Sequence, residues 1–256
     1  MLGIDIHAHM CFPSDGDGVK GYEDVDKIVE QAKKEMKAIV ASSARYEEGL
    51  AVLELSKKHP GFVFPTLGYH PVEGNNKDGI IKLIKENKNL IVGIGEVGMD
   101  FHWVEEPSKR EIQRKEFEEF IQLAKEINKP IVIHSWDAEV ECFEAVKDAG
   151  VQAIFHCFSG SSDLAKRIVE AGFWVSVSTQ VCFSKNIKKI AKVVPLEQMF
   201  LETDAPFLDP DRERKQNTPW NIKLSAEKIA KIKDITAEEV LKQTTENAIK
   251  AFNLPL

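Results

Sequence analysis

Apolar residues recur along this chain in short runs, which are separated by longer stretches of mixed polarity. The runs are rich in Val, Ile and Phe, and few polar residues interrupt them. Strands that are buried on both faces show this pattern, which is typical of parallel sheets. In chain order the runs are LGIDI, KAIVA, FVFPTL, LIVGIG, PIVIH, QAIFH, FWVSVS and MFLET. The pattern therefore predicts eight parallel strands.

The stretches between these runs have the periodicity of amphipathic helices. In residues 108–130, for example, apolar side chains from Phe117 to Ala124 repeat at helical spacing and mark one buried face. Strand-then-helix units repeated eight times over roughly 250 residues are typical of a (β/α)8 TIM barrel. Two further helices, expected over 222–233 and 236–251, would pack outside the barrel as C-terminal extra helices. A doubly wound open sheet is the alternative architecture.

Length and composition narrow the functional classes. No linker or change of composition divides residues 1–256, so we expect a single domain. A formal net charge of −7 disfavours a protein that coats nucleic acid through a broad basic face, but an enzyme that binds a few phosphates is compatible with it. The four cysteines are scattered and are expected to be reduced thiols. Without a signal or membrane-spanning stretch, we expect a cytoplasmic protein with no membrane association and no obligate protein partner.

Histidines and carboxylates follow several of the expected strands. They are His7 and His9 after the first, His70 after the third, Glu96 after the fourth, His134 after the fifth, His156 after the sixth and Asp204 after the eighth. Alternation along a strand turns both first-strand histidines to the same face. In a closed barrel the carboxyl ends of the strands form one rim, whereas an open sheet would spread these residues along a line. Six of these seven residues are expected to be good metal ligands, enough for two ions.

A pair of divalent ions has a definite chemical use. Two ions a few ångströms apart lower the pKa of a bridging water and stabilise the negative charge that its attack creates. Asp204 could bind one ion and also accept the proton of the water. Glu96 could bridge the two ions. Both residues are therefore expected to be catalytic. We expect Zn²⁺, Mn²⁺ or Mg²⁺, although Mg²⁺ usually prefers more oxygen ligands than this set offers.

Five sequence motifs carry a family resemblance. DIHAHM at 5–10, GIGEVGMD at 93–100, PIVIHS at 130–135, FHCFSG at 155–160 and LETDAPFL at 201–208 resemble the successive motifs of the TatD-type metal-dependent deoxyribonucleases. This family is a branch of the amidohydrolase-like metal-dependent hydrolases. The resemblance spans nearly the whole chain, since TTENAIKAFNL near its end is similar to the closing helix of the family.

The resemblance implies a distribution of the ligands. His7, His9 and Asp204 would hold the first ion, His134 and His156 the second, and Glu96 would bridge them. His70, in LGYHP, is similar to a histidine that reaches the substrate phosphate rather than a metal. Two regions depart from the family pattern. Trp136 stands where the family commonly has arginine, and the loop 209–220 matches only loosely, with Arg214, Lys215 and Asn217 as candidate substrate-binding residues.

The resemblance implies a deoxyribonuclease that hydrolyses phosphodiester bonds of DNA or nucleotides, in the manner of a 3′–5′ exonuclease. Aromatic residues after several strands, Trp103 and Trp136 among them, could stack on nucleobases or could line the top of the core. An alternative function is hydrolysis of an amide, ester or lactone by the same two-ion site, which the tryptophan at position 136 favours. A third possibility, a barrel without catalysis, is disfavoured because the ligand set is complete.

Overall fold

The computed structural model describes residues 2–12, 21–211 and 216–256, and in them eight parallel strands form one sheet. The strands are β1 (Ile4–Ala8), β2 (Ala38–Ala41), β3 (Val63–Tyr69), β4 (Gly93–Gly98), β5 (Ile131–His134), β6 (Ala153–Phe155), β7 (Trp174–Val177) and β8 (Met199–Leu201). Each strand pairs with its neighbour in sequence. Just beyond β8, Ala205 pairs in parallel with Ala8 of β1, and this bridge nearly closes the sheet into a barrel. The predicted TIM barrel is confirmed, and the open sheet was the wrong alternative.

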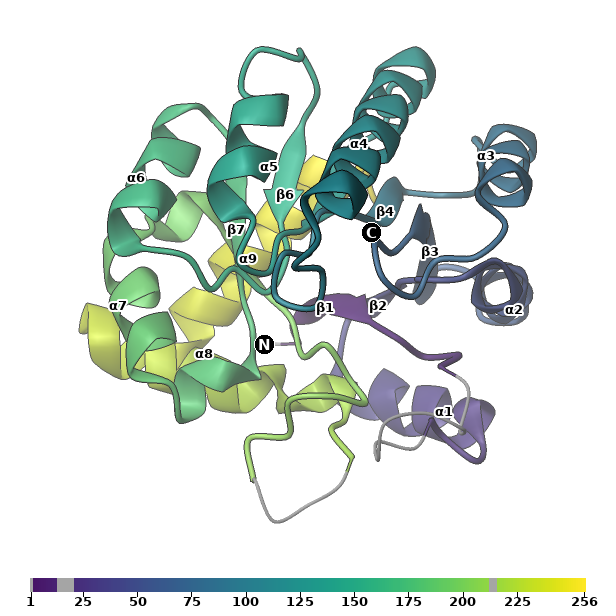
Figure 1. Cartoon of the computed structure of the whole chain (residues 1–256). Helices are drawn as coiled ribbons and strands as arrows, with labels where there is room; N and C mark the ends of the chain where they lie inside the picture. The colour runs from purple at the N-terminus through teal and green to yellow at the C-terminus, as the bar shows by residue number, and fades with distance from the viewer. Residues whose placement is uncertain (1, 13–20, 212–215) are drawn as a thin grey trace.

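Helices alternate with the strands and surround them (Figure 1). In the described residues they are α1 (Val25–Glu35), α2 (Tyr46–Lys58), α3 (Lys77–Glu86), α4 (Pro107–Ile127), α5 (Glu139–Val146), α6 (Ser162–Glu170), α7 (Lys185–Val193), α8 (Ile222–Lys233) and α9 (Ala237–Phe252), with short 3-10 helices at Thr179–Cys182, Leu196–Gln198 and Pro219–Asn221. The two expected C-terminal helices are therefore present as α8 and α9. Thr236 and Glu239 form a capping box at the start of α9, where they satisfy backbone N–H groups.

The core consists of two layers that the strands separate. Strand residues such as Ile131 and Ile133 pack outward against the helices, while Val132 between them faces the barrel interior. At the amino end of the barrel the interior is filled by the last turn of α9, where Ala251 and Phe252 pack among the inward-facing strand residues. Figure 1 shows α9, in yellow, passing behind the strands. The amino end of the barrel is thereby closed with apolar side chains, and the opposite end is left for polar groups.

Irregular strand pairing orients the polar residues at the carboxyl end. Pairing between β1 and β2 shifts between Asp5 and Ala8, and pairing between β4 and β5 shifts between Ile94 and Val97. Such shifts change which face the following side chains occupy. The backbone of Glu96 also comes so close to β3 that a Cβ atom on Gly68 would lie 2.2 Å from the Glu96 nitrogen. Only glycine can occupy that position without displacing Glu96.

No helix in the described residues is long and apolar enough to cross a membrane. The four cysteines are free thiols, as expected from their spacing. The cytoplasmic location stays a prediction.

Candidate metal centre

The closure of the barrel brings the first group of predicted ligands together. His7 and His9 come from β1 and the residue after its end, while Asp204 follows β8. The Asp204 N–H donates to the carbonyl oxygen of His7 at 3.0 Å, which ties the two segments to each other. The Nε2 atoms of the two histidines lie 3.2 Å apart, and Asp204 Oδ1 lies 3.7 Å from that of His7 and 3.6 Å from that of His9. These three side chains form one compact donor group.

Glu96 joins this group to a second one. Its Oε1 atom lies 2.6 Å from His134 Nδ1 and 3.3 Å from His156 Nε2. Its other oxygen, Oε2, lies 3.5 Å from His7 Nε2 and 3.3 Å from His9 Nε2. The carboxylate therefore faces both groups, one oxygen toward each. The same cluster allows two further groupings of three, His7 with His156 and Glu202, and His70 with Asp100 and His134.

A second set of carboxylates holds three of the histidines in place. Glu48 Oε1 lies 3.1 Å from His9 Nδ1, Glu202 Oε2 lies 3.1 Å from His156 Nδ1, and Asp100 Oδ2 lies 2.9 Å from His134 Nε2. When the outer ring nitrogen donates to a carboxylate, the inner nitrogen keeps its lone pair for a metal. Sequence reasoning assigned no role to these three residues. Asp100 and Glu202 lie inside the quoted motifs, but no sequence signal distinguishes Glu48.

Burial and mutual charge shift the acid–base properties of the cluster. Burial, together with the charge of the stacked His156 ring, lowers the pKa of His7 to about 4. Burial opposes protonation of His134, but hydrogen bonds to Asp100 and Glu96 raise its pKa to about 9. Burial raises the pKa of Asp204 to about 6. For Glu96 burial acts in the same direction, but His156, His70 and His134 together outweigh it and hold the pKa of the carboxyl well below its usual range.

The donor set fits divalent metal ions. Five carboxylates gather here, namely Glu48, Glu96, Asp100, Glu202 and Asp204. In the described part of the chain, each of their ion pairs is with a histidine rather than with lysine or arginine. Negative charge that no fixed cation balances favours binding of a cation. Imidazole nitrogens and carboxylate oxygens are the ligands that Zn²⁺ and Mn²⁺ accept. Asp204 and His134 are partly exposed, so the cluster is open to solvent on their side.

His70 lies at the edge of the cluster with a defined tautomer. The backbone N–H groups of Val72 and Glu73 both donate to its Nδ1 atom, each at 3.2 Å. Nδ1 is therefore an acceptor, and in the neutral ring Nε2 carries the proton. Burial lowers the pKa of His70 to about 3, which keeps the ring neutral. Its Nε2 atom lies 3.8 Å from Glu96 Oε1, so this N–H faces the metal centre.

Asn217 holds the loop that follows β8. Its side chain is fully buried, and its Nδ2 atom donates to the carbonyl oxygens of Thr203 and Leu208 at 3.0 and 3.2 Å. Its Oδ1 atom accepts a hydrogen bond from Asn221 Nδ2 at 2.8 Å. The amide thus holds the loop that follows β8, and contact of Asn217 with the substrate stays a prediction. Arg214 and Lys215 lie outside the described residues.

Comparison with known proteins shows which family this chain resembles. The family described as TatD related DNase matches residues 4–253. A protein of Methanocaldococcus jannaschii named an uncharacterized metal-dependent hydrolase is 43% identical over 89% of this chain and 90% of its own length. Deoxyribonuclease TATDN3 of Homo sapiens is 35% identical over 97% of this chain and 94% of its own length.

A solved structure shares the fold. The TatD homologue YJJV of Escherichia coli K12 superposes with a TM-score of 0.87 at 23% sequence identity, and the match covers 99% of this chain and 98% of that one. The family match extends over every strand and over all the predicted ligands. The chain therefore belongs to the family of TatD-related DNases.

Proposed function

We propose that this protein hydrolyses phosphodiester bonds of DNA with two divalent ions bound at the carboxyl end of its barrel. His7, His9 and Asp204 would hold one ion, His134 and His156 the other, and Glu96 both. The observation that carries this proposal is the position of Glu96, whose two oxygens each face one histidine pair. A carboxylate shared in this way is suited to hold two cations close together.

Bound ions would supply Lewis acidity, which activates a water molecule and stabilises charge on the phosphate. The remaining chemistry belongs to the side chains. Asp204 accepts the proton of the attacking water, since its carboxylate is partly exposed and lies 3.7 Å from His7 Nε2 and 3.6 Å from His9 Nε2. Glu202 and Glu48 hold the His156 and His9 rings with their inner nitrogens facing Glu96.

His70 is proposed to contact the substrate phosphate. Its Nε2–H faces Glu96, next to the metal centre, and its Nδ1 atom is held by two backbone N–H groups. A neutral imidazole can donate this hydrogen bond to a non-bridging phosphate oxygen without adding a proton to the site. The side chain therefore positions the phosphate beside Asp204 and the ions.

The proposed substrate is DNA or a nucleotide diester, and the human relative is named a deoxyribonuclease. A site confined to one end of a barrel is suited to the end of a chain, so we also propose an exonuclease-like action of 3′–5′ polarity. The acidic net charge agrees with local binding of a few phosphates rather than a broad basic groove.

The test uses metal-stripped protein and a short oligonucleotide labelled at one end, with Zn²⁺, Mn²⁺ or Mg²⁺ restored separately. We expect stepwise cleavage that needs the metal and is reduced about 10²–10⁴-fold in Asp204→Asn. Asp163→Asn is a matched control, because this aspartate is exposed on α6 and should retain full activity. Labelling each end in turn gives the polarity.

Trp136 favours a second candidate function, hydrolysis of an amide, ester or lactone, because an aromatic side chain stands where the family commonly has a cation for the phosphate. The same protein should be assayed on a panel of carbonyl substrates. A higher kcat/KM on one of them than on any phosphodiester, with protein shown to bind two ions, would replace the nuclease proposal.

A further inference from the structure

Two neighbouring loops at the carboxyl end of the barrel carry an exposed group of aromatic rings. His102 and Trp103 belong to the loop after β4, and Trp136 belongs to the loop after β5. Trp103 is 66% exposed and Trp136 is 43% exposed, although both are large apolar side chains. The His102 ring stacks on Trp136 with centroids 4.0 Å apart and an interplanar angle of 6°. Trp103 meets both rings edge-on. We call these three residues the aromatic platform.

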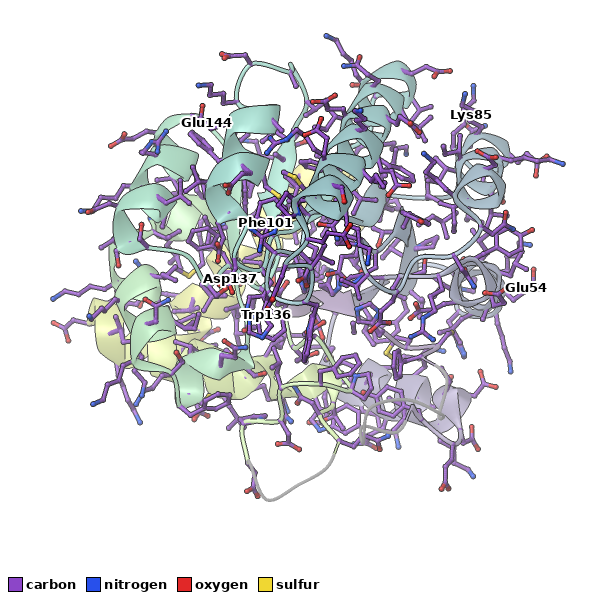
Figure 2. The ribbon with its side chains drawn as sticks, in the orientation of Figure 1. Glu54, Lys85, Phe101, Trp136, Asp137 and Glu144 are labelled. Carbon is purple, nitrogen blue, oxygen red and sulfur yellow. The ribbon has the colours of Figure 1, made fainter. Side chains whose placement is uncertain are left out.

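Hydrogen bonds hold the platform in one arrangement. Asp137 Oδ2 lies 3.0 Å from His102 Nδ1 and orients that ring, while the backbone N–H of Phe101 donates to the carbonyl oxygen of Trp136 at 2.9 Å. Figure 2 shows Phe101, Trp136 and Asp137 grouped near the centre of the view, where the loops lie in front of the strands. The platform is thus preorganised, and a ligand that stacks on it need not order it first.

The platform is coupled to the metal centre through the chain and through one carboxylate. Trp136 follows the predicted ligand His134 by two residues, which span at most about 7 Å. Asp100 Oδ1 accepts the backbone N–H of Trp103 at 2.8 Å, and its Oδ2 atom lies 2.9 Å from His134 Nε2. One side chain therefore positions both a predicted metal ligand and a ring of the platform. A substrate group next to the reacting phosphate would lie within reach of these rings.

The chemistry of the platform favours a flat and uncharged partner. Its surface consists of aromatic faces and edges, and the Asp137 carboxylate that orients His102 would repel a phosphate. Stacking on aromatic rings binds any nucleobase, because every base has a flat π-face. An unpaired base can reach such a surface, whereas a base inside a duplex has both faces covered by its neighbours.

We propose that the aromatic platform of His102, Trp103 and Trp136 stacks a nucleobase adjacent to the scissile phosphate. The enzyme would thereby select the unpaired ends of DNA. This inference rests on the proposed phosphodiesterase function and adds to it a base-binding subsite. Trp136 would recognise the base of the substrate, whereas an arginine at this position would recognise the phosphate.

The test compares two single-stranded oligonucleotides that differ only at their ends. One is intact, and the other carries abasic residues on both sides of the phosphate to be cleaved. We expect wild-type protein to favour the intact strand in kcat/KM by about 5- to 150-fold, the range for one stacked base. Trp136→Ala and Trp103→Ala should remove most of this preference by slowing the intact substrate alone. Trp136→Phe should keep much of it, since a ring remains.

Ile112→Ala is the matched control, because Ile112 is an exposed apolar residue of α4 outside the platform. Its preference should equal that of the wild type. The inference is overturned if Trp136→Ala keeps the full preference, or if it slows intact and abasic strands equally.

A separate binding measurement distinguishes failure of this inference from failure of the proposed function. Metal-free protein is titrated with both strands while tryptophan fluorescence is recorded. Stronger quenching by the intact strand, absent in the Trp136→Phe and Trp103→Phe double variant, supports the platform even if no phosphodiester is cleaved. Equal quenching by both strands contradicts it even in an active nuclease.

Discussion

The two ends of the barrel are built from the same strands but have opposite compositions. At the amino end, inward-facing side chains such as Trp174 and Phe200 stack on each other, with ring centroids 4.8 Å apart, and Phe252 of α9 packs against them. At the carboxyl end, histidines and carboxylates replace the apolar residues, and Glu96 lies in their midst. Val132 and His134, two positions apart on β5, occupy the two environments.

Because of this difference, one end of the sheet contributes mainly to stability and the other end carries the reactive groups. Burial of apolar side chains at the amino end stabilises the fold, whereas burial of charged groups at the other end costs free energy unless they are paired or bind ions. The carboxyl end retains these charges because the proposed reaction needs them. The comparison predicts that substitutions at one end change stability and that substitutions at the other change activity.

Asp204→Asn should show the largest effect at the carboxyl end. We expect kcat with added metal to fall by about 10²–10⁴-fold, because the amide cannot accept the proton of water. The free energy of unfolding should stay the same or rise, since a buried carboxylate is removed. Assays with Mn²⁺ and thermal unfolding of the same preparation measure both quantities. Activity within tenfold of wild type would refute the role of Asp204.

Phe252→Ala should show the reverse behaviour at the amino end. Removing this buried ring leaves a cavity, and we expect a loss of about 3–5 kcal/mol in the free energy of unfolding. Below the unfolding temperature kcat/KM should stay within twofold of wild type. Leu256→Ala, a change at an exposed residue nearby in sequence, should be neutral. A loss of activity in folded Phe252→Ala would show that the two ends are coupled.

Added metal should stabilise the protein through the carboxyl end alone. An ion at a concentration one hundred times its Kd raises the free energy of unfolding by about 2.7 kcal/mol when it binds only the folded state. We expect a higher Tm for stripped protein after Zn²⁺ or Mn²⁺ is added, and a much smaller rise in Glu96→Gln. An unchanged Tm in the wild type, with ions shown to be absent by elemental analysis, would contradict the proposed site.

Asp100→Asn should produce the smallest of these changes. The carboxylate of Asp100 orients His134, and loss of such a partner typically weakens metal binding about 10- to 100-fold. Competition with a fluorescent chelator measures the Kd of each ion. Only the ion that His134 would hold should be affected, and Asp148→Asn at an exposed position should bind both ions as the wild type does. Equal metal affinities in Asp100→Asn and wild type would show that Asp100 does not support metal binding by His134.

Much of the fold could be predicted from the sequence because parallel strands are buried on both faces. Their apolar runs stand out locally, and the polar residue that ends each run marks the carboxyl rim. Glu48 could not be found in this way. It lies in α2 beside Glu47, which is hydrogen-bonded at the surface to Asn75, and nothing local distinguishes the two. The burial of Asn217 could not be predicted either, because a polar loop residue in sequence can still be fully buried in space.

The sequence by itself determined the number of strands, the strand ends that carry chemistry and the types of the donor atoms. Hydrophobic periodicity reports the burial of each segment, and these features depend on each segment alone. Only the tertiary structure decided which oxygens of Glu96 face which histidines, how irregular pairing turns the first histidines, and which carboxylates support them. Those features arise from contacts between residues far apart in the chain, which exist only after the barrel has closed.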